Sequence, residues 1–197
     1  MARNVFISFR YSDGIGYKNK LSDLFDTRYD TIDYSEDEDR SKMSDDTIRN
    51  YLYGKLRRSS VTIILITPKA VNHHKDWSGR YDDWMYDEIR YSLEDRENNR
   101  TNGLVAVYIP EAEDLLISSR GSGSITINNV DNLFRKNMMN VKSNYKKNPK
   151  EGIYDRDLDS YCSLILWSDF VKDIDKYINL AAKKRDESYK YNLVKRL

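Results

Sequence analysis

The stretch Val61-Thr62-Ile63-Ile64-Leu65-Ile66-Thr67 decides the fold class of this chain. It is apolar at nearly every position and rich in β-branched residues, which favours a strand buried on both faces. Strands of this kind are typical of a parallel sheet. Similar apolar runs lie at residues 5–9, 104–109 and 161–167, and a weaker one lies at residues 31–34.

Amphipathic helical patterns separate the apolar runs, at residues 16–27, 44–57, 81–96 and from 168 onward. Strands that alternate with helices predict a doubly wound α/β domain with right-handed crossovers. We therefore expect a flavodoxin-like parallel sheet of five strands in the order 2-1-3-4-5. The strand at residues 61–66 should have helices on both of its faces.

The alternation of strands and helices breaks before the last apolar run. A Gly/Ser-rich tract at residues 118–124 indicates a flexible turn, and a basic run follows it. We expect one domain with an irregular insert and a polar tail that either extends the last helix or frays. The predicted parts of this single domain, residues 1–197, are a core at 3–110 and 160–180, an insert at 111–159, and a C-terminal helix and tail at 168–197.

Composition and charge exclude several classes of protein. The 197 residues include 33 basic and 32 acidic ones, so the net charge of +1 provides no broad positive field for a specific nucleic-acid partner. Cys162 is the single cysteine, which excludes an intramolecular disulfide and a multi-cysteine zinc site. The sequence has neither an apolar run of ~18 residues nor a signal-peptide core, so we expect a cytoplasmic protein without membrane contact.

Several familiar nucleotide and metal motifs are missing from the expected places. Gly14 and Gly16 form a bare G-x-G after the first strand, which is too short for a dinucleotide fingerprint. The chain contains no P-loop, and the third strand ends in Ile66-Thr67-Pro68 without the aspartate of a phospho-receiver domain. The adjacent pair His73-His74 is interpreted as part of a polar loop, because neighbouring side chains diverge.

The carboxyl ends of the strands are where an open α/β sheet binds its ligands. Glu88 lies one turn after Trp84, on the predicted helix that follows the third strand. A carboxylate beside a buried apolar stripe at this edge is a functional candidate, while ordinary ion pairs on a solvated helix face are the alternative.

Three segments, in this order, resemble the signature motifs of TIR domains. Val5-Phe6-Ile7-Ser8-Phe9-Arg10 resembles the first box, and Leu65-Ile66-Thr67-Pro68-Lys69 resembles the third strand and its exit. Asp83-Trp84-Met85-Tyr86-Asp87-Glu88-Ile89 resembles the Trp-x-x-x-Glu motif, whose glutamate is catalytic in NAD-cleaving members. The chain is most similar to bacterial TIR proteins such as the TIR component of the Thoeris anti-phage defence system.

The resemblance implies cleavage of the bond between nicotinamide and ribose, with NAD as the substrate and with neither cofactor nor metal. The carboxylate would stabilise the oxocarbenium-like ribose and bind its hydroxyl groups. Phe9 would stack on a base and Arg10 would pair with the pyrophosphate. Asp13 either caps the first helix or binds ligand, and Trp84 either packs its helix onto the sheet or contacts substrate. Glu88 is thus the catalytic candidate, and the substrate-binding candidates are Ser8, Phe9, Arg10, Asp13 and Trp84.

The sequence leaves the product and the class of function open. Attack by water gives ADP-ribose, whereas attack by a ribose hydroxyl or an adenine nitrogen gives a cyclic product. The resemblance also implies self-association and a downstream effector that responds to a diffusible product. The alternatives are a non-catalytic TIR-like interaction or nucleotide-sensing module and, more distantly, a nucleoside deoxyribosyltransferase, which also uses a glutamate.

Overall fold

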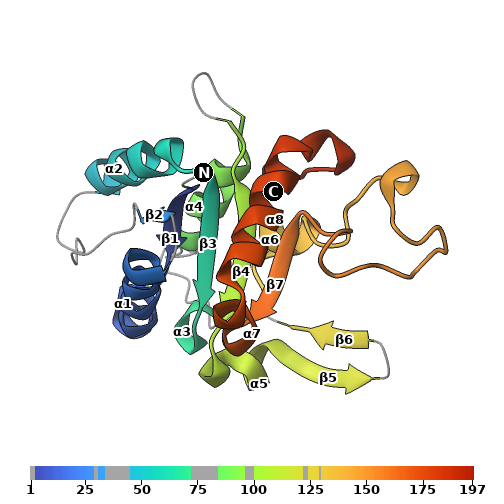
Figure 1. Cartoon of the computed structure of the whole chain (residues 1–197), viewed down its shortest axis with the longest axis horizontal. Helices are drawn as coiled ribbons and strands as arrows, with labels where there is room; N and C mark the ends of the chain where they lie inside the picture. The colour runs from blue at the N-terminus through green and yellow to red at the C-terminus, as the bar shows by residue number, and fades with distance from the viewer. Residues whose placement is uncertain are drawn as a thin grey trace.

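The main sheet consists of five parallel strands in the order β2-β1-β3-β4-β7 (Figure 1). This confirms the predicted parallel α/β sheet, and the five apolar runs follow one another in the expected order. The strands are β1 (Arg3–Ser8), β2 (Thr31–Asp33), β3 (Val61–Ile66), β4 (Gly103–Tyr108) and β7 (Cys162–Leu166). The computed structural model describes residues 3–28, 31–33, 45–71, 84–95, 100–121, 124–128 and 130–197.

Helices cover both faces of the sheet, as the double burial of β3 requires. One face packs against α1 (Tyr11–Arg28) and α8 (Ile174–Asp186), through a cluster that includes Ile63. The opposite face packs against α2 (Asp45–Arg58) and α4 (Trp84–Leu93). Successive residues of β3 point to opposite faces of the sheet, so β3 contributes side chains to both layers of the core.

Helix boundaries differ from the sequence pattern at both ends of the chain. The first helix begins at Tyr11, five residues earlier than its apolar stripe indicates. The last helix is divided, because α7 (Trp167–Lys172) ends before α8 begins. The Asp173 carboxylate caps α8 by accepting a hydrogen bond from the Lys176 amide at 3.2 Å. Residue 44, where the second helical pattern begins, lies outside the described residues.

The insert is more regular than expected. Its strands β5 (Ile117–Gly121) and β6 (Ser124–Ile127) form an antiparallel pair, so most of the predicted flexible turn at 118–124 is strand. The Ser119 and Thr126 hydroxyls are joined at 3.0 Å across the pair. Elements of four or five residues are too short for sequence periodicity to show them. The helical elements around the hairpin are η1 (Pro110–Ala112), α5 (Glu113–Leu116), α6 (Asn132–Lys136) and η2 (Ser143–Tyr145).

The C-terminal tail first continues α8 as far as Asp186 and then docks against the insert. After η3 (Ser188–Lys190), Tyr191 forms an antiparallel bridge with Val141. The side-chain amide of Asn137 then donates to the carbonyl of Val194 at 2.8 Å. These contacts tie the chain end to the segment after α6. Within the described residues, no helix combines the length and apolar character that crossing a membrane requires.

Candidate functional site

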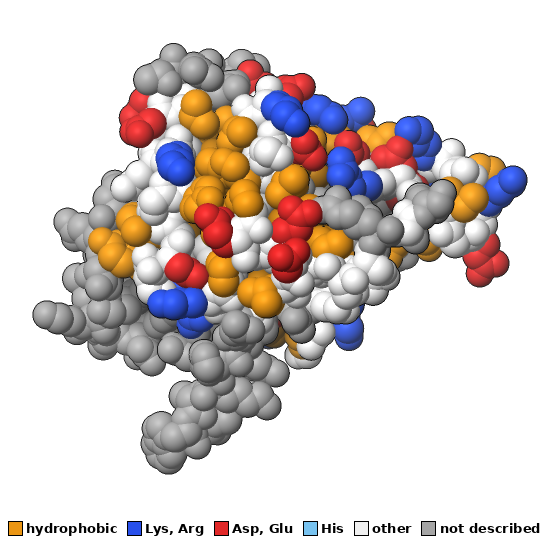
Figure 2. All heavy atoms as spheres, turned by 90° about the horizontal axis from the view of Figure 1, so that it is seen from below, with side chains coloured by type: hydrophobic (Ala, Val, Ile, Leu, Met, Phe, Trp, Pro, Cys, Tyr) orange, Lys and Arg blue, Asp and Glu red, His pale blue; other side chains and the backbone are white. Residues whose placement is uncertain are grey.

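The strand order reverses between β1 and β3, which makes their carboxyl ends the topological switch point of the sheet. The chain passes from β1 to β2 on one side, and from β3 to β4 and β7 on the other. Ligands of open α/β sheets bind in the crevice outside such a point. Figure 2 views the molecule from the end at which the arrows of Figure 1 terminate, and shows hydrophobic side chains and carboxylates sharing this surface.

Ser8 is a buried hydroxyl at the end of β1. Its side chain lies on the same face of the sheet as Phe6, which packs against Leu52 and Leu56 of α2. The residue is 1% exposed, and its Oγ has no hydrogen-bond partner in the part of the chain that the structure describes. A buried polar atom without a partner is costly, and a bound ligand group is one explanation for retaining it.

Glu88 lies level with Ser8 on the same face of the sheet. The Oγ of Ser92 on α4 is 2.8 Å from the Oγ1 of Thr62 on β3. The helix of a crossover runs antiparallel to the strands that it connects. Glu88 therefore lies one turn of α4, about 6 Å, from Ser92 in the direction of the carboxyl ends of the strands. Two residues along β3, about 7 Å, lead to Ile64. Ile64 pairs with Ser8 in the sheet register, so the carboxylate and the unpartnered hydroxyl occupy one level.

The surroundings of the Glu88 side chain are largely apolar. Ile89 of the same helix packs into the cluster around β3 and β4, and Tyr91 packs with Phe6 on the other side. Glu88 is 8% exposed, so its carboxylate is removed from most solvent. Burial of a carboxylate beside apolar surface is the setting in which catalytic acids and electrostatic stabilisers are found.

Arg10 and Asp13 converge on the backbone of Lys69, just after β3. Arg10 Nη1 donates to the Lys69 carbonyl at 2.6 Å, and the Lys69 amide donates to Asp13 Oδ2 at 2.9 Å. Asp13 lies in the first turn of α1 and not at its cap, so the capping interpretation is wrong. The two side chains hold the start of α1 against α3 (Pro68–Val71), beside the carboxyl ends of β1 and β3.

Phe9 points away from Ser8 and Glu88. It packs against the cluster on the α1 and α8 face of the sheet. A Cβ atom at Gly14 would lie 3.2 Å from Phe9 Cβ and 3.5 Å from Thr67 Cγ2, so a glycine lets α1 approach this closely. The structure therefore places Ser8 and Glu88 on one face of the sheet and Phe9 on the other. The Trp84 side chain lies outside the described residues, although its backbone begins α4.

Two features near Glu88 were not anticipated from the sequence. The first is the pair of buried hydroxyls on Thr62 and Ser92. Its only indication in the sequence is a polar residue, Thr62, inside an apolar run. The second is a cavity of about 10 Å³ beside α4, roughly the space of one water molecule. Its walls include Ile64, Met85 and Ile89. Within the described ranges, no cluster of three or more His, Cys, Asp or Glu side chains is arranged to hold a metal ion.

One family of known proteins matches this chain. The family is described as Thoeris protein ThsB, TIR-like domain, and its model matches residues 6–114. That range is more than half of the chain, extends from β1 into α5, and includes both Ser8 and Glu88. The hairpin, β7 and the tail lie beyond it. The chain therefore belongs to the TIR-like domain family of the Thoeris protein ThsB, which has a role in anti-phage defence.

Proposed function

We propose that this TIR-like domain cleaves NAD between nicotinamide and ribose, with Glu88 as the catalytic residue. The observation that carries the proposal is the burial of Glu88 on the same face of the sheet as the Ser8 hydroxyl, which has no hydrogen-bond partner among the described residues. Membership of a TIR-like family supports it, because the motif around Glu88 resembles that of NAD-cleaving members.

The chemistry needs one well-placed negative charge. Nicotinamide is already cationic in NAD, so it leaves as a neutral molecule with the electron pair of the broken C1′–N bond. Positive charge develops on the ribose, and the Glu88 carboxylate stabilises it electrostatically. Water then bonds to C1′ and loses a proton to give ADP-ribose. An internal ribose hydroxyl attacks in the same way, whereas an adenine ring nitrogen attacks through its lone pair, and either of these gives a cyclic product.

The other candidate residues divide into two groups around this reaction. The Ser8 hydroxyl would hydrogen-bond a substrate hydroxyl in this proposal. Arg10 lies beside the carboxyl ends of β1 and β3, where its Nη1 donates to the Lys69 carbonyl. A guanidinium held in this way suits the diphosphate of a dinucleotide. Phe9 and Asp13 support the site through packing and through the Lys69 backbone.

A non-catalytic interaction or nucleotide-sensing module is the second candidate. The observation that favours it is the tight packing around α4. Glu88 is 8% exposed, and the cavity lined by Met85 and Ile89 of the same helix is far smaller than a nucleotide. A domain that binds a nucleotide or a partner without turnover needs no exposed carboxylate at this point.

Replacing Glu88 by glutamine tests the proposal. Glu88→Gln keeps the size of the side chain and removes its charge, so we expect nicotinamide release to fall about 10²–10³-fold, equivalent to roughly 3–4 kcal/mol of transition-state stabilisation. Release of nicotinamide from NAD is measured with purified protein, with extract of phage-infected cells added as a source of activating signal.

Asp87→Asn is the matched control. Asp87 precedes Glu88 on α4, is partly exposed and pairs with Arg90 at 3.0 Å, so its loss should leave the rate nearly unchanged. Thermal unfolding of all three proteins shows whether the fold is retained. Equal rates for wild type and Glu88→Gln would remove Glu88 from the mechanism. NAD binding by a wild type that releases no nicotinamide would establish the sensing module instead.

A further inference from the structure

A buried chain of polar side chains fastens α4 to the sheet one turn away from Glu88. Thr62 Oγ1 and Ser92 Oγ are 2.8 Å apart, and both residues are fully buried at 0% exposure. One hydroxyl donates to the other. Asn102 extends the chain, because its side-chain amide donates to Thr62 Oγ1 at 3.3 Å.

Asn102 connects this polar pair to the ends of two helices. Its amide also donates to the carbonyl of Leu56 in α2 at 3.1 Å, and its backbone N–H donates to the carbonyl of Ser92 at 2.7 Å. The Tyr161 hydroxyl donates to the Asn102 carbonyl at 2.8 Å from the start of the last strand. The C-terminal end of α4 is thus tied to β3, β4 and α2 through directional bonds.

We infer that Thr62 and Ser92 are positioning residues for Glu88 in the reaction proposed above, on which this inference rests. Ser92 and Glu88 are four residues apart, so they lie on one face of α4. Apolar contacts such as those of Ile89 tolerate rotation and sliding of a helix, because they have no preferred direction. The hydroxyl pair has a required distance and angle, so it fixes how far α4 is turned and how deep its inner face lies.

Small displacements matter at such a site. A carboxylate stabilises a developing charge only where the charge appears, and a shift of about 1 Å can cost ~10²-fold in rate. Loss of the hydroxyl pair would let α4 settle by a fraction of that distance. We therefore expect an effect on kcat and little effect on KM for NAD, because the diphosphate and bases are bound elsewhere.

The single variants Thr62→Val and Ser92→Ala test the pair. Each should lower kcat for nicotinamide release about tenfold, keep KM within about twofold, and lower the melting temperature. Thr62→Ser keeps the hydroxyl and should retain kcat within about twofold of wild type. This rescue distinguishes a need for the hydrogen bond from a need for the methyl group.

The double variant Thr62→Val/Ser92→Ala distinguishes an effect on the position of Glu88 from an effect on the stability of the fold. Each single variant leaves a buried hydroxyl that has lost a partner, whereas the double variant removes both hydroxyls, so its melting temperature should partly recover. Its kcat should stay about tenfold below that of wild type, because α4 still lacks the hydrogen bond that holds it to β3. Ser163→Ala removes a buried hydroxyl from β7 on the other face of the sheet, and should lower the melting temperature without lowering kcat.

The outcomes separate this inference from the proposed function. If Glu88→Gln abolishes release but the Thr62 and Ser92 variants retain wild-type kcat, the positioning role is wrong and the proposed function stands. A kcat that recovers together with the melting temperature in the double variant also overturns the positioning role. If wild type releases no nicotinamide, or if Glu88→Gln changes nothing, the proposed function and this inference fail together.

Discussion

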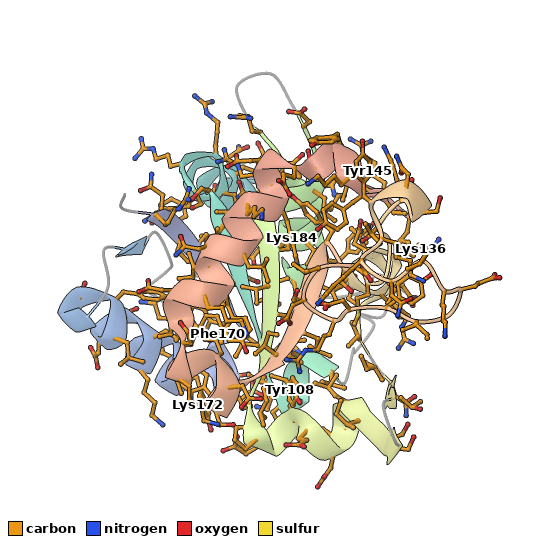
Figure 3. All side chains as sticks on the ribbon, turned by 45° about the vertical axis from the view of Figure 1, so that its right-hand side comes forward. Tyr108, Lys136, Tyr145, Phe170, Lys172 and Lys184 are labelled. Carbon is orange, nitrogen blue, oxygen red and sulfur yellow. The ribbon has the colours of Figure 1, made fainter. Side chains whose placement is uncertain are left out.

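Lys184 carries an ammonium group into the protein core. It lies on the part of α8 that covers the sheet (Figure 3), is 3% exposed, and donates to the Ser163 hydroxyl at 2.7 Å. Burial lowers the pKa of Lys184 from 10.5 to about 8, although the Cys162 thiol and the nearby acidic loop act in the opposite direction. A single hydroxyl replaces little of the water that a charged amine loses.

The lowered pKa makes stability rise with pH. Between pH 8 and 10.5 the unfolded chain holds the Lys184 proton more tightly than the folded one, so a rise in pH favours folding across this window. Wild type should therefore gain about 2–3 kcal/mol of unfolding free energy from pH 7.5 to 10 relative to Lys184→Met. Urea denaturation of both proteins at the two pH values measures this difference.

Lys183→Met provides the comparison for this test. Lys183 is exposed on the neighbouring position of α8, so its replacement should leave the pH dependence of the unfolding free energy as in wild type. Parallel pH profiles for wild type and Lys184→Met would show that the Lys184 amine is solvated in the folded protein.

The hairpin of β5 and β6 should be less stable than the strands of the main sheet. It forms a separate two-stranded sheet that extends from the body (Figure 1). Its attachment includes the bond from the Asn128 amide to the Leu116 carbonyl at 2.7 Å. A two-stranded ribbon is marginally stable in water, because each strand has only one neighbour.

Amide exchange should report this difference between elements. Amides of residues 117–121 and 124–127 should exchange within minutes, while those of β3 and β4 should stay protected, because opening the hairpin exposes little apolar surface. Hydrogen–deuterium exchange with mass spectrometry resolves these peptides. Protection of the hairpin equal to that of β3 would mean that the ribbon is held as firmly as the core.

Charge at the scale of the whole molecule argues against tight nucleic-acid binding. The net charge is +1, and some basic residues of the insert and of α8 are paired with carboxylates. Lys147 contacts Asp155 at 2.6 Å, and Lys176 contacts Asp157 at 3.5 Å. Such pairs reduce the positive field that a phosphate backbone would meet.

Binding of single- or double-stranded DNA should therefore be weak and steeply dependent on salt. We expect dissociation constants no tighter than the nonspecific range of about 10⁻⁴–10⁻⁶ M at physiological salt. Fluorescence anisotropy with labelled oligonucleotides at about 50 and about 200 mM salt tests this, because the effect of counterion release is large over this range. Nanomolar, sequence-selective binding would contradict it.

Local patterns in the sequence were sufficient for the strands and the parallel sheet, and they also single out Glu88 as the catalytic candidate. A strand buried on both faces must be apolar along its length, so β3 and β4 are visible without any knowledge of their neighbours. Glu88 is visible because the motif around it is continuous in sequence. The short elements of the insert were not visible, because four or five residues carry no measurable period.

The tertiary structure alone decided which residues meet. The bond from Lys69 to Asp13 and the pairing of Thr62 with Ser92 join residues that are 56 and 30 positions apart. At Gly103 a Cβ atom would lie 2.2 Å from the carbonyl oxygen of Ala181, a close approach of β4 and α8. These contacts depend on sheet register and on the rotation of each helix about its axis. Both are set by packing of the core together with hydrogen bonds between residues distant in sequence, so no local pattern encodes them.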